Sequence, residues 1–231
     1  MVTMKKTVII TGARRGLGLS LTRQFVSNQW NVLPLVRNEK DIKVLKELPD
    51  CSPIISDITC DEVRSAIHES LKKIGTVDLL INNAGIPGSG TKLDETSPNE
   101  VLSLIDVHCI GALRVTQAVL PFLSENGVII NVSSRFGSIM KVSKGELDHV
   151  KCSYSYRIAK AAQNMLTQCM CREFRDKGIK ICSIHPGRLK TENASSDADR
   201  TPEEAAFRLY AILNTIEHGK FYSLFEDTIE W

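Results

Sequence analysis

The sequence lacks the features of membrane, secreted and nucleic-acid-binding proteins. No stretch approaches the roughly 20 apolar residues of a transmembrane helix, and the apolar run Val8–Ile10 after Lys5 and Lys6 is too short for a signal peptide. The net charge is only +2, without a dense basic stripe. We therefore expect neither a nucleic acid nor a membrane as a partner.

Cysteine is present but shows no pattern. The seven cysteines are scattered, without a CxxC pair or a Cys/His spacing typical of a metal site. Cys169 and Cys171 lie two residues apart on an expected helix, so they point to different faces. We therefore interpret the cysteines as reduced thiols of a cytoplasmic protein that binds no metal.

Short β-branched apolar runs alternate with helical periods along the whole chain. The 231 residues are enough for one α/β domain spanning 1–231. The expected strands are Thr7–Ile10, Val32–Val36, Pro53–Ser56, Val77–Ile81, Val128–Val132, Ile179–Ile184 and, as a short seventh, Phe221–Ser223. Nearly continuous apolar runs are typical of buried parallel strands. The predicted fold is a Rossmann-like, doubly wound parallel β-sheet of six to seven strands with helices on both faces.

Helix starts support this alternation. Residues 97–100 (Ser-Pro-Asn-Glu) and 201–204 (Thr-Pro-Glu-Glu) each combine a hydroxyl N-cap, a proline at the first helical position and a glutamate three residues after the cap. Thr59 and Glu62 have the same cap spacing and predict a third helix start. Further helices are expected over about 17–28 and from Tyr156 through Phe174.

The first predicted strand runs into Thr-Gly-Ala-Arg-Arg-Gly-Leu-Gly at 11–18. Glycines there permit a tight turn and let backbone N–H groups approach a phosphate at the helix start. The spacing differs from GxGxxG, so a plain strand-to-helix turn is the alternative. Arg15 in this turn and Arg37 after the second strand stand where an NAD site has a carboxylate. The pair favours the 2′-phosphate of NADP, although each arginine alone is equally explained as a surface residue.

Two further strand ends are ambiguous. Asn83, Ala84 and Gly85 follow the fourth strand, where small residues suit the close passage of a ligand or simply a turn. His185 ends the sixth strand before Pro186-Gly187, and it is either a catalytic base or a structural residue of that turn. Neither segment identifies a ligand by itself.

Tyr156 and Lys160 are four residues apart and so share one helix face. A nearby ammonium lowers the pKa of a tyrosine from about 10 toward the working pH, as a general acid or base requires. Ser134, after the fifth strand, supplies a hydroxyl that can hydrogen-bond a substrate oxygen. A lone Tyr-x-x-x-Lys pair is common by chance, so these residues carry weight only as a set.

Together, and in this order, the elements resemble the short-chain dehydrogenase/reductase family over essentially the whole chain. The matching set is Thr-Gly-x-x-x-Gly-x-Gly at 11–18, Asp57, Asn-Asn-Ala-Gly at 82–85, Ser134, Tyr156 with Lys160, and Pro186-Gly187 with Thr191. The compact length and the ending from Gly219 to Trp231 are similar to the C-factor-like and sniffer-like carbonyl reductases of that family.

The resemblance implies an oxidoreductase that transfers hydride between NAD(P)(H) and a carbonyl/alcohol pair. Together with Arg15 and Arg37, it leads to the hypothesis of an enzyme that prefers NADP(H) over NAD(H) and acts on a small or medium, largely apolar substrate. Tyr156 would exchange the hydroxyl proton, Lys160 would hold the nicotinamide ribose and lower the tyrosine pKa, and Ser134 would steady the substrate oxygen. The expected cofactor contacts are Gly12, Gly16, Leu17 and Gly18 at the diphosphate, Asp57 and Ile58 at the adenine, Asn83, Ala84 and Gly85 at the ribose, and Pro186, Gly187 and Thr191 at the nicotinamide. A homodimer or homotetramer is also implied.

The chain departs from the family pattern in two places. Three residues before Gly111, where the family commonly has an Asn of a proton relay, this sequence has His108. The histidine either keeps the relay through its backbone, passes protons itself from a pKa of about 6.5, or packs and bonds a carbonyl. This departure leaves open the alternative that the chain is a catalytically weak or inactive dinucleotide-sensing or scaffold protein with the same fold.

The second departure concerns loops. Ser134 and Tyr156 are 22 residues apart, which is longer than usual, and the extra residues around 141–151 are expected at the mouth of the substrate site. The loop Glu192–Arg200 is short and polar.

Overall fold

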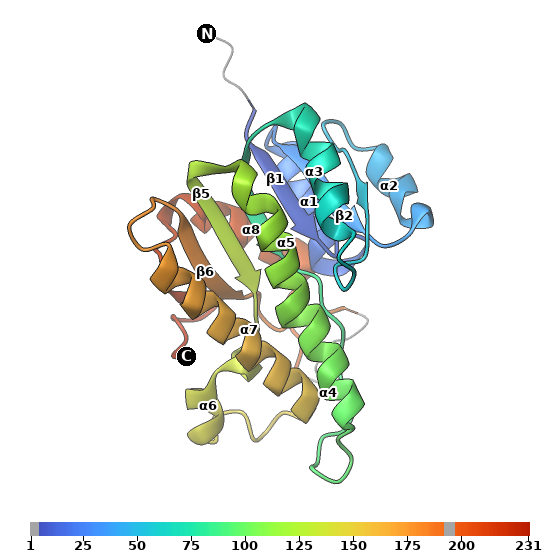
Figure 1. Cartoon of the computed structure of the whole chain (residues 1–231). Coiled ribbons are helices and arrows are strands. Elements are labelled where there is room, and N and C mark those ends of the chain that lie inside the picture. The colour runs from blue at the N-terminus through green and yellow to red at the C-terminus, as the bar shows by residue number, and fades with distance from the viewer. Residues whose placement is uncertain (1–4, 192–196) are drawn as a thin grey trace.

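The computed structural model describes residues 5–191 and 197–231, which form one parallel sheet of seven strands in the order β3-β2-β1-β4-β5-β6-β7 (Figure 1). The strands are β1 Thr7–Thr11, β2 Asn31–Val36, β3 Ile54–Ile55, β4 Val77–Asn82, β5 Leu123–Val132, β6 Lys180–His185 and β7 Phe221–Ser223. Every neighbouring pair is parallel. The predicted doubly wound sheet is confirmed, and its order reverses at β1, which lies between β2 and β4.

Helices cover both faces of this sheet (Figure 1). They are α1 Gly16–Ser27, α2 Lys43–Lys46, α3 Val63–Ile74, α4 Pro98–Ile105, α5 Gly111–Val119, α6 Ile139–Ser143, α7 Tyr154–Glu173 and α8 Pro202–Ile212. On one face of the sheet, Phe25 of α1 and Leu209 of α8 are buried in the same core. On the other face, a second core buries Leu71 of α3, Val115 of α5 and Met170 of α7. Burial on both faces explains why the strands are almost continuously apolar.

Four of the helix starts show how far local sequence set the boundaries. The caps at Ser97 and Thr201 form as predicted, the second as a complete capping box. The predicted cap at Thr59 is wrong, because Asp57 accepts hydrogen bonds from the backbone and hydroxyl of Thr59, and α3 begins later, at Val63. Helix α7 begins at Tyr154, two residues before the prediction, because the Ser153 hydroxyl caps it.

Helices α4 and α5 are joined by a π-helical turn, Asp106–Ile110, and belong to a continuous helical run Pro98–Phe122. By length and composition alone, this run is long and apolar enough to cross a membrane. The expectation that no segment of the chain is long and apolar enough is therefore wrong. Its Val115 and Ala118 are nevertheless fully buried in the core against the sheet, as in a core helix. Of the predicted polar loop Glu192–Arg200, residues 192–196 lie outside the described part.

Candidate active site

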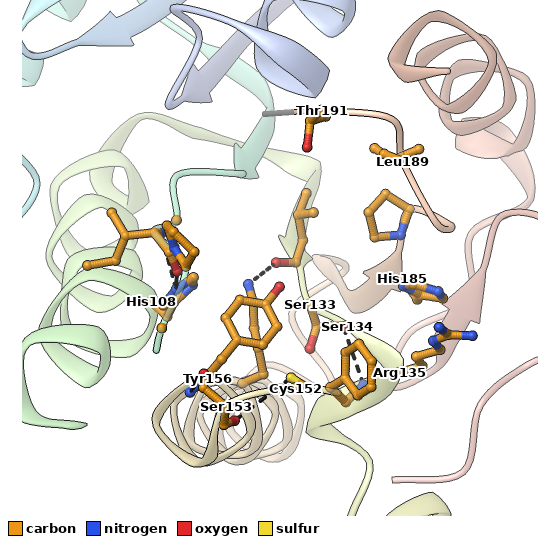
Figure 2. A pocket seen from close by; sticks show the side chains of 18 of the residues that line it. His108, Ser133, Ser134, Arg135, Cys152, Ser153, Tyr156, His185, Leu189 and Thr191 are labelled. Carbon is orange, nitrogen blue, oxygen red and sulfur yellow. Dashed lines mark hydrogen bonds between the residues drawn. The ribbon is translucent and has the colours of Figure 1, made fainter. Parts of the chain in front are cut away.

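A cavity of about 530 Å³ lies where β4, β5 and β6 end (Figure 2). The predicted site residues in its wall are Leu17, Asn83, Gly85, His108, Ser134, Tyr156, Lys160, Pro186, Gly187 and Thr191. The predicted residues Gly12, Arg15, Gly16, Gly18, Arg37, Asp57, Ile58 and Ala84 are not in this wall. The structure therefore gathers the candidate catalytic groups in one space, on the carboxyl side of the strands as expected for a doubly wound sheet.

The turn after β1 requires glycine for steric reasons. Gly12 has φ +66°, and a Cβ there would lie 2.7 Å from the Cα of Ala84. A Cβ on Gly18 would lie 2.3 Å from the carbonyl oxygen of Gly12 and 2.7 Å from Nδ2 of Asn83. The segments after β1 and β4 thus pack too closely at this turn for a side chain at either glycine.

Asn83 ties the end of β4 to this turn. Its amide Nδ2 donates to the carbonyl oxygen of Thr11 at 2.9 Å, and Oγ1 of Thr11 accepts from the backbone N–H groups of Asn83 and Ala84, both at 3.0 Å. Sequence reasoning missed Thr11, whose signal was the Thr-Gly pair itself. The predicted contact of Asn83 with the ribose stays a prediction, since the side-chain amide is engaged in this brace.

The start of α1 fits a diphosphate. Its N-cap residue, Arg15, makes no side-chain capping hydrogen bond, whereas α4, α7 and α8 are capped by the hydroxyls of Ser97, Ser153 and Thr201. The first N–H groups of α1 are therefore not taken up by a capping side chain, and they lie at the positive end of the helix. This is the arrangement with which dinucleotide-binding proteins hold phosphate.

The adenine side is less complete than the sequence suggested. Arg15 and Arg37 are both exposed, after the neighbouring strands β1 and β2. The side chain of Ile58 is buried, and a Cβ on Gly111 would meet it at 2.7 Å, so Ile58 can offer a nucleotide only its backbone. The carboxylate of Asp57 already accepts two hydrogen bonds from Thr59.

Tyr156 lies in the first turn of α7 and Ser134 directly after β5 (Figure 2). Burial raises the pKa of Tyr156 to about 12, with a smaller contribution from Cys152, while the Ser134 hydroxyl acts in the opposite direction and lowers this pKa. Among the protein's own groups, the net effect is to keep the phenol protonated.

Lys160 is buried one turn further along α7. Its Nζ donates to the carbonyl oxygen of Val132 at 2.6 Å and to Oε1 of Gln163 at 2.9 Å, and lies 5.8 Å from the centre of the Tyr156 ring. Burial lowers the pKa of Lys160 to about 7. Burial is the largest cause of both pKa shifts. That Lys160 lowers the tyrosine pKa stays a prediction.

A buried amide holds α7 against the strands that carry these groups. Oδ1 of Asn164 accepts from the hydroxyls of Ser133 at 2.6 Å and Ser183 at 3.2 Å, and its Nδ2 donates to the carbonyl oxygen of Gly137 at 3.1 Å. Asn164 lies four residues after Lys160, so these bonds fix the height of Tyr156 and Lys160 relative to Ser134. Sequence reasoning missed this residue, because an asparagine inside a helical pattern carries no distinctive signal.

His108 lies in the π-helical turn, almost fully buried. Its Nε2 is 2.9 Å from the carbonyl oxygen of Ile86, and its ring meets that of Tyr156 edge-on at 5.4 Å. A Cβ on Gly85 would lie 2.5 Å from this ring, which explains the glycine. Burial, followed by the charge of Lys160, lowers the pKa of His108 to about 3. The hypothesis that His108 titrates near pH 6.5 is therefore wrong. Its imidazole instead forms a hydrogen bond with a carbonyl of the loop after β4.

The substrate end of the cavity is more basic than expected. Arg135, Lys151 and Arg188 belong to its wall, where the sequence suggested a largely apolar pocket. Lys151 and Cys152 come from the region between Ser134 and Tyr156 that was expected at the mouth of the site. No group of three or more His, Cys, Asp or Glu residues within 5–191 and 197–231 is placed to hold a metal ion.

A doubly wound sheet, a glycine turn at an uncapped helix start and a Ser-Tyr-Lys set at the strand ends define a dinucleotide-dependent oxidoreductase. The chain belongs to the short-chain dehydrogenase family, whose model, described as short chain dehydrogenase, matches residues 6–201. The resemblance inferred from the ordered motifs is thereby confirmed.

Known proteins extend this similarity to carbonyl reductases. C-signal of Myxococcus xanthus is 32 % identical over 162 residues, which are 68 % of this chain and 94 % of that protein. The NADPH-bound carbonyl reductase from chicken fatty liver is 25 % identical and superposes with a TM-score of 0.88 over 98 % of this chain and 99 % of that one. Carbonyl reductase Sniffer of D. melanogaster, at 23 % identity, has the same fold, with a TM-score of 0.88 over 99 % of this chain and all of that chain (100 %).

Proposed function

We propose that this oxidoreductase is an NADP(H)-dependent carbonyl reductase. The observation that carries the proposal is the convergence of Ser134, Tyr156 and Lys160 on one cavity, whose wall also includes Leu17 from the start of α1. The similar chicken carbonyl reductase, which binds NADPH, supports the choice of reaction and cofactor.

Each side chain has a distinct part in the proposed reaction. When bound, NADPH would supply the hydride for the carbonyl carbon. The Tyr156 hydroxyl would donate the proton to the carbonyl oxygen, so that the product is the alcohol. Ser134 donates a hydrogen bond to the same oxygen as negative charge develops. Lys160 holds the nicotinamide ribose and, when protonated, favours the phenolate that remains.

The direct test measures oxidation of NADPH by the purified chain with a panel of aldehydes, ketones and quinones. We expect turnover of at least one of these classes. If the protein binds NADPH and reduces none of them, the proposal fails, and a dinucleotide-sensing or scaffold role takes its place.

We propose that the protein prefers NADP(H) over NAD(H), because Arg15 and Arg37 can bind the 2′-phosphate of NADP(H) beside the start of α1. A guanidinium–phosphate contact contributes about 1.5–3 kcal/mol, and about 1.4 kcal/mol corresponds to tenfold in affinity. NADPH should thus bind at least about tenfold more tightly than NADH, and Arg37→Asp should abolish or reverse this ratio. Calorimetric titration with both nucleotides measures it.

The matched control is Arg23→Asp, which makes the same charge change at an exposed position further along α1. That variant should keep the parent's ratio of affinities. Equal affinities of the parent for NADPH and NADH would show that the two arginines do not bind the 2′-phosphate.

A second prediction concerns His108. Because its pKa of about 3 keeps the imidazole neutral, His108→Asn should change kcat by only a few-fold and leave the pH profile between about pH 6 and 9 unaltered. A shift of the low-pH limb would instead make His108 a titrating relay group. If the parent reduces nothing and His108→Asn becomes active, the sensor alternative is correct.

We also propose a cytoplasmic homodimer or homotetramer. Leu102 of α4 and Ile158 and Met165 of α7 are exposed apolar side chains on two helices that pack together. None of the seven cysteines, all within the described residues, forms a disulfide, which suits a reducing compartment. Sedimentation of the parent and of Met165→Lys tests the assembly, since a charge in this interface should shift the population toward monomers.

A further inference from the structure

His185 is a buried polar side chain without a partner. It ends β6, is 4 % exposed, and lines the cavity, and neither ring nitrogen has a hydrogen-bond partner among the described residues. Burial, followed by the charges of Arg135 and Arg188, lowers the pKa of His185 to about 3. The imidazole is therefore neutral, with one N–H to donate and one lone pair. Buried polar groups in proteins are normally paired, so this one points to a ligand that pairs it.

Arg135 is a buried cation in the same part of the cavity. It directly follows Ser134 and is only 6 % exposed. Within the described residues its guanidinium makes one hydrogen bond, to Asp197 at 2.5 Å, and Asp197 belongs to the loop beyond Thr191. Figure 2 shows Arg135 and His185 next to each other, on the side of the cavity away from His108.

The charges of the cavity wall are of one sign. Arg135, Lys151 and Arg188 belong to the wall together with Lys160, whereas no aspartate or glutamate among the described residues does. Arg188 is paired with Asp199, which lies outside the wall. Asp197 does not belong to the wall, and its ion pair with Arg135 shows that this guanidinium can hold a carboxylate. A guanidinium with a neutral imidazole beside it matches a carboxylate, since both groups can donate hydrogen bonds to its two oxygens.

We propose that Arg135 and His185 form a carboxylate-binding subsite, and that the substrate is a carbonyl compound which also carries a carboxylate. The inference rests on the proposed reduction of a carbonyl at Tyr156 and names its substrate class. Because Arg135 and His185 line the same cavity as Ser134 and Tyr156, one small molecule can bind its carboxylate at this subsite and place its carbonyl beside the Ser134 and Tyr156 hydroxyls. Asp197 is an internal counter-ion that the substrate carboxylate displaces from Arg135.

The test compares 2-, 3- and 4-carboxybenzaldehyde with their methyl esters, with NADPH as the reductant. For at least one isomer, kcat/KM of the parent should be about tenfold or more higher for the acid than for the ester, as expected for a charge-assisted hydrogen bond. Arg135→Met should lower this acid-to-ester ratio at least about tenfold, and His185→Phe several-fold. Asp197→Asn should act in the opposite direction and raise the ratio, because it removes the competing carboxylate.

A matched control distinguishes the subsite from general effects on packing. Arg157 also stacks on the ring of Phe136, at 5.0 Å against 5.2 Å for Arg135, but it is not in the cavity wall. Arg157→Met should keep the parent's acid-to-ester ratio. An equal ratio for the parent and Arg135→Met, or a loss of acid preference in Asp197→Asn, would overturn the subsite.

A binding measurement separates this inference from the proposed function. Benzoate should raise the Tm of the parent in a concentration-dependent way and benzamide should not; the effect should vanish in Arg135→Met and grow in Asp197→Asn. Benzoate binding of this kind without reduction of any aldehyde supports the subsite and contradicts the reductase. Reduction of acids and esters at equal rates, without benzoate binding, supports the reductase and overturns the subsite. If Arg135→Met does not fold, His185→Phe and Asp197→Asn test the subsite by the same acid-to-ester ratio and the same benzoate-dependent Tm.

Discussion

Tyr156→Phe is expected to lower kcat by roughly 10²–10⁴-fold while the affinity for NADPH stays within a few-fold of the parent. The substitution keeps the ring and its edge-on contact with His108, and it removes only the hydroxyl that we propose as the proton donor. Its effect should therefore fall on the chemical step rather than on folding. Steady-state kinetics with the best aldehyde of the panel, together with calorimetric titration of NADPH, measures both quantities.

Tyr154→Phe is the matched control for this variant. Tyr154 is 42 % exposed and lies in the same first turn of α7, so the loss of its hydroxyl should leave kcat unchanged. Ser134→Ala should lower kcat in the same direction as Tyr156→Phe but by less, since it removes a hydrogen bond and not the proton donor. Near-parental turnover of Tyr156→Phe would show that another group supplies the proton.

Gly12→Ala is expected to have the largest effect on stability. An alanine at φ +66° costs about 1–2 kcal/mol, and its Cβ would in addition lie 2.7 Å from the Cα of Ala84, so backbone has to move. We expect a total loss of about 3 kcal/mol or more in the free energy of unfolding, hence a Tm lower by about 6 °C or more. NADPH binding should weaken as well, because the displaced segment leads into the start of α1.

Gly219→Ala isolates the backbone term of this prediction. Gly219 has φ +82°, similar to Gly12, but an added Cβ would meet nothing within 4 Å. It should destabilise the protein by only about 1–2 kcal/mol and leave NADPH binding intact. Urea unfolding of both variants measures the difference, and equal losses would contradict a steric role for the contact between Gly12 and Ala84.

The sequence was sufficient for the fold because its signals are local or periodic. Apolar runs of strand length alternating with capped helices predicted the parallel sheet, and the caps at Ser97 and Thr201 formed as expected. The local signal failed at Thr59, where the carboxylate of Asp57 engages the would-be cap. A competing partner two residues away is invisible to a pattern that scores only the cap and the glutamate.

The sequence by itself determined the alternation of strands and helices, the glycine turn after β1, and the presence of Ser134, Tyr156 and Lys160. Only the tertiary structure decided the electrostatics of the site, since a pKa depends on burial by elements that are distant in sequence. Burial raised the pKa of Tyr156, where sequence spacing suggested a lower one, and it lowered those of Lys160 and His108. The approach of Arg135 and His185 is likewise tertiary, because Arg135 follows β5 and His185 ends β6, two strands that the sheet places side by side.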